Sequence, residues 1–276
     1  MTEEETKKEE VEEISEEEMK KAIVEKIVGK EVEEKSEAEL ERDRLVVQER
    51  RRVEDELARW QPKTKLGKLV KEKKLTDIDE ILEKNKILEA GIADTLLNLK
   101  SDLLAIGQAK GKFGGGKRRV WRQTQKKSSE GNVPTFACMA VAGDENGHIG
   151  LGYGKAKETL PGRTKAIRDS KLKIMKIKRG CGSFDCSCGE EHSVPFRVEG
   201  SCGSLRVILM PAPQGTGLVV GDELKKILRL AGIRDVYGKT FGQTRSTINL
   251  AKACMNALKQ TTEIIDFRDS GGKKKK

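Results

Sequence analysis

The segment Thr135–Lys157 restricts the fold of this chain more than any other. Its apolar first half leads into Asn146-Gly147, a pair that tolerates positive φ and is typical of tight hairpin turns. The return strand then alternates, so that one face carries Ile149, Leu151 and Tyr153 and the other carries Gly150, Gly152 and Gly154. Because glycine weakens a strand, a face without side chains indicates the close approach of another backbone or of a ligand. The sequence therefore predicts an antiparallel hairpin with one closely approached face.

Charge is distributed unevenly along the 276 residues. Residues 1–60 hold 22 acidic and 13 basic side chains, a net charge of −9, and because the whole chain carries +10, the remainder carries +19. A body this basic points first to nucleic acid and second to an anionic membrane surface. No apolar run is long enough to span a bilayer, and no apolar signal segment opens the sequence, so we expect a cytoplasmic protein without membrane association.

Periodicity predicts an acidic extension, a basic connector and a first globular domain in the N-terminal two thirds of the chain. Residues 1–60 are expected to be a disordered or helical tail, and residues 61–77 form the connector. The domain, residues 78–178, reads as α-β-β-β-α, with helices expected at 78–85, 92–106 and 163–178. In the last helix the inward residues are expected to be Ile167, Ser170, Ile174 and Ile177.

A second domain with the order β-β-α-β-α is expected over residues 194–262, after a Cys/Gly-rich loop at 179–193. Its strands and helices are expected at Val194–Glu199, Ser204–Met210, Asp222–Leu230, Ile233–Tyr237 and Ser246–Gln260. A short basic tail, residues 263–276, ends the sequence. The fold class is therefore α+β.

The Cys/Gly-rich loop contains a candidate metal site. Three thiols and an imidazole lie within twelve residues, at Cys181, Cys186, Cys188 and His192. Such ligands fit a closed tetrahedral site for one structural zinc ion, and nearby glycines allow tight folding. The spacing differs from a double CxxC, so a glycine-rich loop with reduced thiols is the alternative, and Cys202 is an alternative ligand. Cys138 and Cys254 sit in apolar runs and are more simply core residues.

Sequence patterns of catalysis are incomplete. Gly111–Arg118 matches G-x4-G-K, but Arg118 replaces the Ser or Thr that would hold magnesium, and a strand rather than a helix follows. His148 has no evident Ser or Cys partner, and neither HExxH nor GxSxG occurs. We expect no enzymatic activity and no small-molecule substrate.

Several basic runs favour RNA or DNA over the simpler reading of a solvated charged face. The segment from Gly107 to Lys127 contains no acidic residue, and two further runs follow the hairpin. Aromatic residues make up only 4% of the chain, which argues against base stacking as the main binding mode. The candidate RNA-binding residues are Lys110, Lys112, Lys117, Arg118, Arg119, Arg122, Lys126, Lys127, Lys155, Lys157, Arg163, Lys165 and Arg168.

The residues resemble a known family at several places in the expected order. Val141–Glu158 is similar to the signature hairpin of the universal small-subunit ribosomal protein five family, and roughly residues 60–260 follow that family. Its C-terminal domain is resembled by Pro211–Gly217, Leu230–Val236 and Thr244–Leu258. The cysteine insert and Trp60–Gly67 resemble the archaeal and eukaryotic branch.

The resemblance implies a double-stranded-RNA-binding-like first domain and a second domain without catalysis. It implies a structural constituent of the small ribosomal subunit that binds 16S-type ribosomal RNA, contacts small-subunit protein four, lies near the mRNA entry and supports translational accuracy. Ile149, Leu151 and Tyr153 are then expected to face the helices of the RNA-binding domain, and the glycine face to meet RNA or a neighbouring strand. Lys155 and Lys157 would mark the junction with RNA. The family's arginine-rich tip is replaced here by a segment with Glu130, so contact is least expected from 128 to 134.

Two other function classes stay open. One is an extraribosomal zinc-containing nucleic-acid-binding regulator. The other is a small-molecule kinase built on the second domain, although Pro211–Gly221 offers only Asp222 as a nearby carboxylate.

Overall fold

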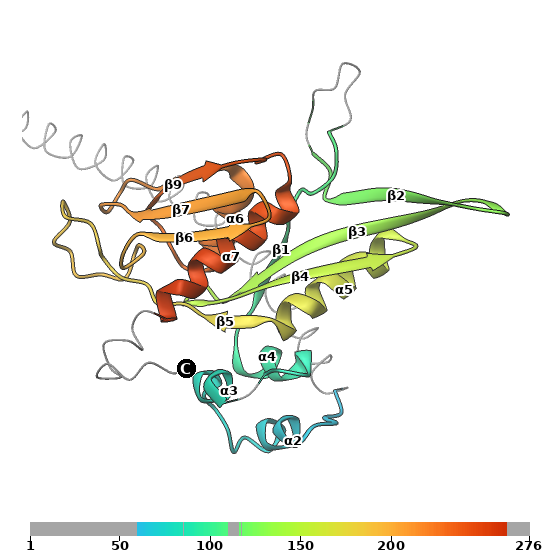
Figure 1. The fold of residues 1–276 in the computed structure, drawn as a ribbon. Coiled ribbons are helices and arrows are strands. Elements are labelled where there is room, and N and C mark those ends of the chain that lie inside the picture. The colour runs from blue at the N-terminus through green and yellow to red at the C-terminus, as the bar shows by residue number, and fades with distance from the viewer. Residues whose placement is uncertain (1–59, 85, 110–115, 117, 264–276) are drawn as a thin grey trace, which may run out of the picture. The chain divides into compact units, whose positions relative to one another are not determined.

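The computed structural model describes residues 60–84, 86–109, 116 and 118–263 (Figure 1). The acidic extension up to residue 59 and the basic tail from residue 264 lie outside the described residues. The described elements all belong to one unit that begins at Gln61.

The first part of this unit contains four helices and five strands. They are α2 (Lys65–Lys71), α3 (Ile78–Lys84), α4 (Ala90–Leu96), β1 (Lys100–Leu103), β2 (Trp121–Ser128), β3 (Gly131–Gly143), β4 (His148–Ala156), α5 (Thr159–Leu172) and β5 (Ile174–Lys176). The second part contains β6 (Val198–Cys202), β7 (Leu205–Pro211), β8 (Leu218–Val219), α6 (Asp222–Leu230), β9 (Val236–Phe241) and α7 (Thr247–Glu263).

The predicted hairpin is formed by β3 and β4. The two strands are antiparallel, with Gly143 opposite Ile149, and Gly147 in the turn has a φ of 105°. The Asp144 carboxylate accepts hydrogen bonds from the backbone N–H groups of Asn146 and His148, which closes the turn locally.

The first sheet has the order β1-β3-β4-β5, and β2 also pairs with β3. β1 pairs with residues 140–143 of β3 and β2 pairs with residues 131–138, so both share the edge opposite β4. The thirteen residues of β3 are long enough to accommodate both partners.

Two helices differ from their predicted extents. The helix expected over 92–106 ends at Leu96, and Lys100–Leu103 instead pairs with the free edge of β3. The helix expected over 163–178 starts at Thr159 and ends at Leu172, while Ile174–Lys176 pairs with β4. Ile174 and Ile177 are buried as expected, but not on a helix. Apolar spacing did not distinguish helix from strand here because an available sheet edge decided the conformation.

The second sheet has the order β6-β7-β9-β8. Its elements follow the expected sequence of strands and helices, and the two-residue strand β8, parallel to β9, is additional. The predicted strands Val194–Glu199 and Ile233–Tyr237 are both displaced towards the C-terminus, to Val198–Cys202 and Val236–Phe241.

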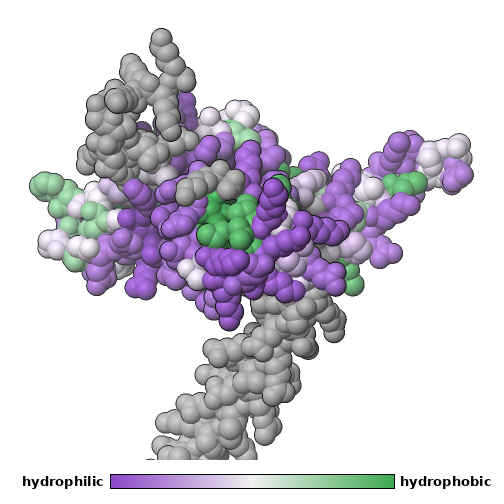
Figure 2. Space-filling model, turned by 90° about the horizontal axis from the view of Figure 1, so that it is seen from below, coloured by the Kyte–Doolittle hydropathy of each residue, from purple (hydrophilic) through white to green (hydrophobic). Residues whose placement is uncertain are grey.

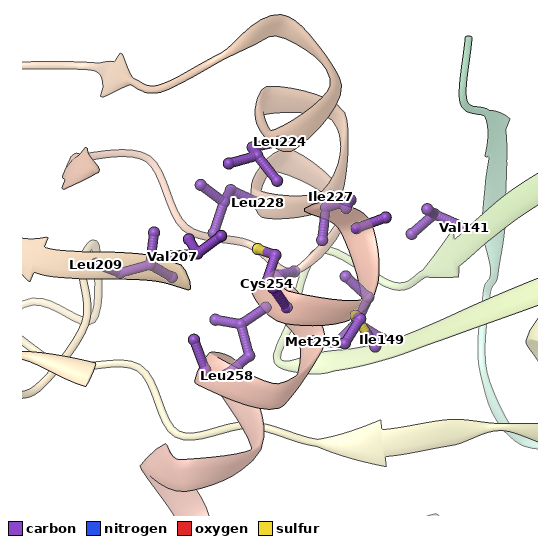
Figure 3. Close-up of a cluster of buried hydrophobic side chains, with 14 of the residues drawn as sticks. Val141, Ile149, Val207, Leu209, Leu224, Ile227, Leu228, Cys254, Met255 and Leu258 are labelled. Carbon is purple, nitrogen blue, oxygen red and sulfur yellow. The ribbon is translucent and has the colours of Figure 1, made fainter. Parts of the chain in front are cut away.

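One hydrophobic core joins the two sheets (Figure 3). Val141 and Ile149 of the hairpin lie in the same cluster as Leu224 and Leu228 of α6 and Leu258 of α7. The backbone N–H of Glu145 also donates a hydrogen bond to the Leu230 carbonyl at 3.0 Å. The hairpin is therefore fixed to the second domain by its apolar face and its turn.

The glycine face of β4 packs against the backbone of α5. A Cβ atom added to Gly150, Gly152 or Gly154 would lie 2.1, 2.1 or 2.3 Å from a carbonyl oxygen of Ser170, Ala166 or Gly162. The expectation of RNA or a neighbouring strand at this face is thus wrong, because a helix lined with small residues four positions apart occupies it.

The expected orientation of the apolar face is wrong as well. Ile149 is buried and Leu151 half-buried against the core shared with the second domain, whereas Tyr153 is 42% exposed. The hairpin thus separates two layers, with α5 on its glycine side and the second domain on its apolar side.

Candidate nucleic-acid interface and metal centre

The four predicted metal ligands come together in space. Their ligand atoms all lie within 4.8 Å of one another. The Cys186 sulfur is 3.2 Å from that of Cys188, which is 3.6 Å from that of Cys181, and Nε2 of His192 is 3.7 Å from the Cys186 sulfur. A tetrahedral zinc ion with Zn–S bonds of about 2.3 Å separates its sulfurs by about 3.8 Å, so these side chains fit that ion with small adjustments.

Backbone pairing closes the metal loop at its base. Gly180 and Ser193 exchange two backbone hydrogen bonds of 2.9 Å. A Cβ atom on Gly182 would lie 2.1 Å from the Pro195 carbonyl oxygen, so a glycine is needed where the two arms of the loop come close. The alternative ligand Cys202 lies in β6 and is outside the cluster.

The thiols of the loop and of the core have different pKa values. Hydrogen bonds from the backbone N–H groups of Cys188 and Gln214 lower the pKa of Cys186 to about 6, and the hydrogen bond with Cys186 raises the pKa of Cys188 to about 11. Burial raises the pKa of Cys254 to about 12. A thiolate is the form that binds a metal, and the lowered pKa favours this form at Cys186.

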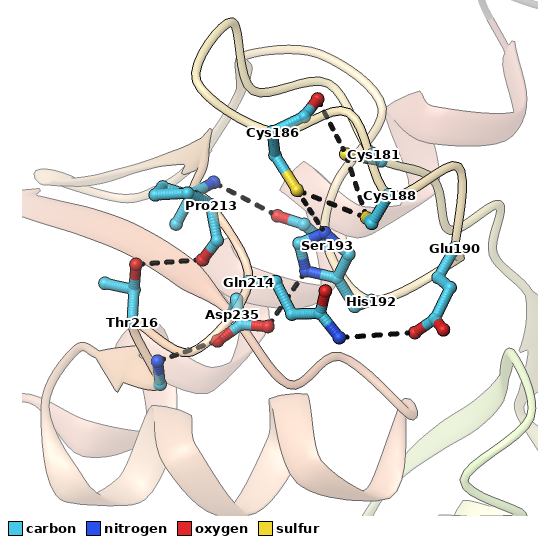
Figure 4. A network of polar contacts seen from close by, with 12 residues as sticks. Cys181, Cys186, Cys188, Glu190, His192, Ser193, Pro213, Gln214, Thr216 and Asp235 are labelled. Carbon is cyan, nitrogen blue, oxygen red and sulfur yellow. Dashed lines mark hydrogen bonds and ion pairs between the residues drawn. The ribbon is translucent and has the colours of Figure 1, made fainter.

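His192 is held by a residue that the sequence did not indicate. Its Nδ1 lies 2.9 Å from Oδ2 of Asp235, and the side chains are only 3% and 6% exposed (Figure 4). Asp235 is 43 residues away in the chain, and no local pattern connects it with the cysteine loop.

The other histidine, His148, joins two carboxylates instead of forming a catalytic set. Nδ1 lies 2.7 Å from Asp144 and Nε2 lies 2.9 Å from Asp79, to which Lys176 also binds. The hydrogen bond with Asp144 raises the pKa of His148, against the effect of burial. This cluster connects α3 to the hairpin turn.

The β2–β3 hairpin carries three of the candidate RNA-binding residues. Arg122, Lys126 and Lys127 are exposed, and β2 is exposed on both faces after Trp121. Residues 131–135 of β3 pair with β2 but not with β4, so this part extends beyond the rest of the sheet (Figure 1). In Figure 2 the same region, at the right, is mostly hydrophilic.

A second group of candidates gathers where β4 leads into α5. Lys155, Lys157 and Lys165 are exposed and line one shallow depression with Thr135 and Pro161. Arg168 is exposed farther along α5. The Tyr153 N–H donates a hydrogen bond to Asp169 of α5 at 2.9 Å, which helps fix the helix relative to the strand.

The remaining candidates have different positions. Arg118 and Arg119 are exposed just before β2, whereas Lys110, Lys112 and Lys117 lie outside the described residues. The Arg163 guanidinium lies 5.3 Å from the centre of the Trp121 ring. This cation–π contact joins α5 to β2, so Arg163 also has a structural role.

The connector holds a basic surface that was not among the candidates. Thr64 caps α2 by accepting a hydrogen bond from the Gly67 N–H, and Glu89 accepts hydrogen bonds from the N–H groups of Lys63 and Thr64. The six lysines of this segment are all exposed: Lys63, Lys65, Lys68, Lys71, Lys73 and Lys74. The positive charge of residues 61–77 was the sequence signal that could have identified this surface.

Within the described part of the chain, no helix combines the length and apolar character that a membrane crossing requires. The basic surfaces thus occur without a transmembrane helix among these residues.

Comparison with known proteins identifies both domains. Residues 117–178 match the profile of the ribosomal protein S5 N-terminal domain, and residues 200–269 match that of its C-terminal domain. The small ribosomal subunit protein uS5 of Nanoarchaeum equitans is 48% identical over 207 residues, covering 74% of this chain and 89% of the relative. Those of Hyperthermus butylicus and Methanobrevibacter smithii are 48% and 44% identical, covering 75% and 74% of this chain and 91% and 90% of the relatives.

These matches confirm the resemblance seen in the hairpin and in the second domain. The family consists of ribosomal proteins, which are structural components and not enzymes. The chain belongs to the ribosomal protein S5 family, in its archaeal uS5 branch.

Proposed function

We propose that this protein is a structural constituent of the small ribosomal subunit in the cytoplasm, where it binds 16S-type ribosomal RNA. The observation that carries this proposal is the convergence of Lys155, Lys157 and Lys165 at one place, beside an exposed basic hairpin, in a chain of the S5 family. Exposed lysines and arginines neutralise phosphates and release counterions, which supplies most of the affinity for a polyanion.

The form of this surface favours recognition of RNA shape over base sequence. Its cations are long flexible side chains on a sheet edge and a helix, and such groups reach phosphates on either side of an RNA groove. The double-stranded-RNA-binding likeness of the first domain is proposed from the family resemblance. Contact with small-subunit protein four, a location near the mRNA entry and an influence on translational accuracy are proposed from the family resemblance.

The lysine pair at the start of α5 offers a direct test. We expect Lys155→Glu combined with Lys157→Glu to weaken binding to 16S-type RNA about tenfold or more and to reduce the salt slope by about two phosphate contacts. A matched control, Lys239→Glu with Lys252→Glu, changes the same charge at exposed positions of the second domain. An unchanged slope in the Lys155/Lys157 variant, measured by filter binding over a salt series, would refute this assignment.

The cellular form of the protein separates the ribosomal role from an extraribosomal one. In a sucrose gradient, native protein should migrate with small subunits at low salt and dissociate at high salt. Protein found only in the light fractions at low salt would instead indicate a free nucleic-acid-binding regulator.

We also propose one structural zinc ion at Cys181, Cys186, Cys188 and His192, supported by the spacing of their ligand atoms. Bound there, the ion would cross-link a loop that has little apolar core of its own. Protein purified without chelators should contain about one zinc per chain by elemental analysis, and Cys186→Ser should lose it while Cys202→Ser keeps it. Zinc-free wild-type protein would contradict the site.

A further inference from the structure

We propose that Asp235 is the positioning residue of the metal centre and that it transmits metal occupancy to the loop Pro211–Gly217. The inference rests on the proposed zinc site, and it adds two things to it. Asp235 selects which nitrogen of His192 faces the metal, and it makes order in the neighbouring loop Pro211–Gly217 depend on the metal.

His192 is held through both its ring and its backbone. Besides the contact between its Nδ1 and Asp235, its carbonyl oxygen accepts hydrogen bonds from the N–H groups of Arg234 at 2.8 Å and of Asp235 at 3.1 Å. The segment before β9 therefore holds both the backbone and the ring of His192. Because the two residues are 3% and 4% exposed, water does not compete for these contacts.

The contact with Asp235 determines which ring nitrogen of His192 carries the proton. A neutral imidazole carries one N–H, and the Asp235 carboxylate can only accept a hydrogen bond, so the proton belongs on Nδ1. Nε2 is then left with its lone pair directed towards the Cys186 sulfur, 3.7 Å away. Metal-binding histidines commonly donate the other N–H to a carboxylate in this way, which fixes both tautomer and orientation.

Asp235 also contacts the loop Pro211–Gly217. Its other oxygen, Oδ1, accepts a hydrogen bond from the Gly217 N–H at 2.8 Å. The Ser193 hydroxyl accepts one from the Ala212 N–H at 3.3 Å, and the Gln214 amide donates one to Glu190 at 3.4 Å. Pro211–Gly217 is therefore attached directly to the metal loop through Ser193 and Glu190, and it is connected to the His192 ring through Asp235 (Figure 4).

The chemical test replaces the carboxylate by an amide of the same size. We expect Asp235→Asn to bind zinc about 10- to 100-fold more weakly than wild type, because an amide can place a donor against Nδ1 and remove the preference for the correct tautomer. Competition with a chromophoric chelator measures this affinity. The control, Asp222→Asn, removes a carboxylate that is 93% exposed, and it should match wild type.

A second variant and a second measurement keep the test decisive if Asp235→Asn folds poorly. Asp235→Glu retains the carboxylate and should bind zinc more tightly than the Asn variant. In wild-type protein, hydrogen exchange at the Gly217 amide should slow at least tenfold when zinc is added to the metal-free form.

Two results would overturn the role of Asp235 while leaving the zinc site intact. One is equal zinc affinity of the wild type and the Asn variant, and the other is a hydrogen-exchange rate at the Gly217 amide that zinc does not change. Wild-type protein that binds no zinc would remove both. RNA affinity is read separately, so failure of the ribosomal function is distinguishable from either result.

Discussion

The two sheets hold their helices in opposite ways. In the first sheet, three glycines of β4 bring the strand against the backbone of α5, and the apolar cluster on that side is small, with Cys138, Ala140 and Ala166 at its centre. In the second sheet, one glycine of β6 contacts the backbone of α7, and large buried side chains such as Leu209 make most of the core. α5 is therefore held by close approach, and α7 is held largely by side-chain volume.

This difference has a consequence for function. α5 carries Lys165 and Arg168, and Lys155 lies at the end of the glycine strand. Because the strand and the helix cannot separate or rotate without losing their close contact, the backbone positions that carry the proposed RNA-binding cations keep a fixed spacing.

The largest effect is expected from adding one methyl group to the glycine strand. In Gly152→Ala the new Cβ would lie 2.1 Å from the Ala166 carbonyl oxygen and 2.2 Å from the Ser170 nitrogen, and both are backbone atoms. We expect the free energy of unfolding to fall by about 4 kcal/mol or more in urea denaturation. The control Gly221→Ala has open space around the new atom and should cost less than about 1 kcal/mol. Similar losses of unfolding free energy in both variants would show that α5 is not held by its close approach to β4.

The next effect comes from removing side-chain volume. Leu209→Ala truncates a fully buried residue of β7 and should cost about 3 kcal/mol. The same change at half-buried Ile167 of α5 should cost about 1 kcal/mol, because less apolar surface is lost. If both cost the same in urea denaturation, α5 would depend on side-chain volume as α7 does.

The smallest effect is a pH dependence at the hairpin turn. The pKa of His148 is raised in the folded protein, so its contribution to stability is complete below its unfolded pKa of about 6.5 and is lost as pH rises through the folded value. Burial alone would raise the pKa values of Asp79 and Asp144, but both are lowered, because hydrogen bonds from His148 act together with Lys176 at Asp79 and with the backbone N–H groups of Asn146 and His148 at Asp144. The contribution of these carboxylates to stability is lost only in acid.

We therefore expect wild type to lose about 1 kcal/mol between weakly acidic and weakly alkaline pH, after allowance for the 40% exposure of Asp79. Denaturation of His148→Gln over the same pH range should show no such loss. Asp79→Asn should retain part of it through Asp144. A pH dependence that persists in the Gln variant would show that other groups cause it.

Local patterns predicted local features of this molecule. Asn146-Gly147 identified the hairpin, and the candidate metal ligands were found because they lie within twelve residues of one another. The glycine face correctly indicated a close backbone, but its partner depended on small residues of α5 whose pairing with the strand is a property of the folded chain.

The features that were not predicted depend on contacts between residues that lie far apart in the sequence. β1, a mostly polar and exposed segment, and β5 are short strands that form because an edge of the sheet is available beside them. The proposed role of Asp235 depends on a contact with a residue 43 positions away, and the shared core of the two sheets requires both domains to be folded.

We propose that the β2–β3 hairpin and the β4–α5 junction together bind ribosomal RNA. Ultraviolet cross-linking of native small subunits, followed by mass spectrometry of the attached peptides, tests it most directly. We expect RNA-linked peptides from residues 118–127 and 155–168. Cross-links confined to the second domain, with both of these regions free of RNA, would contradict it.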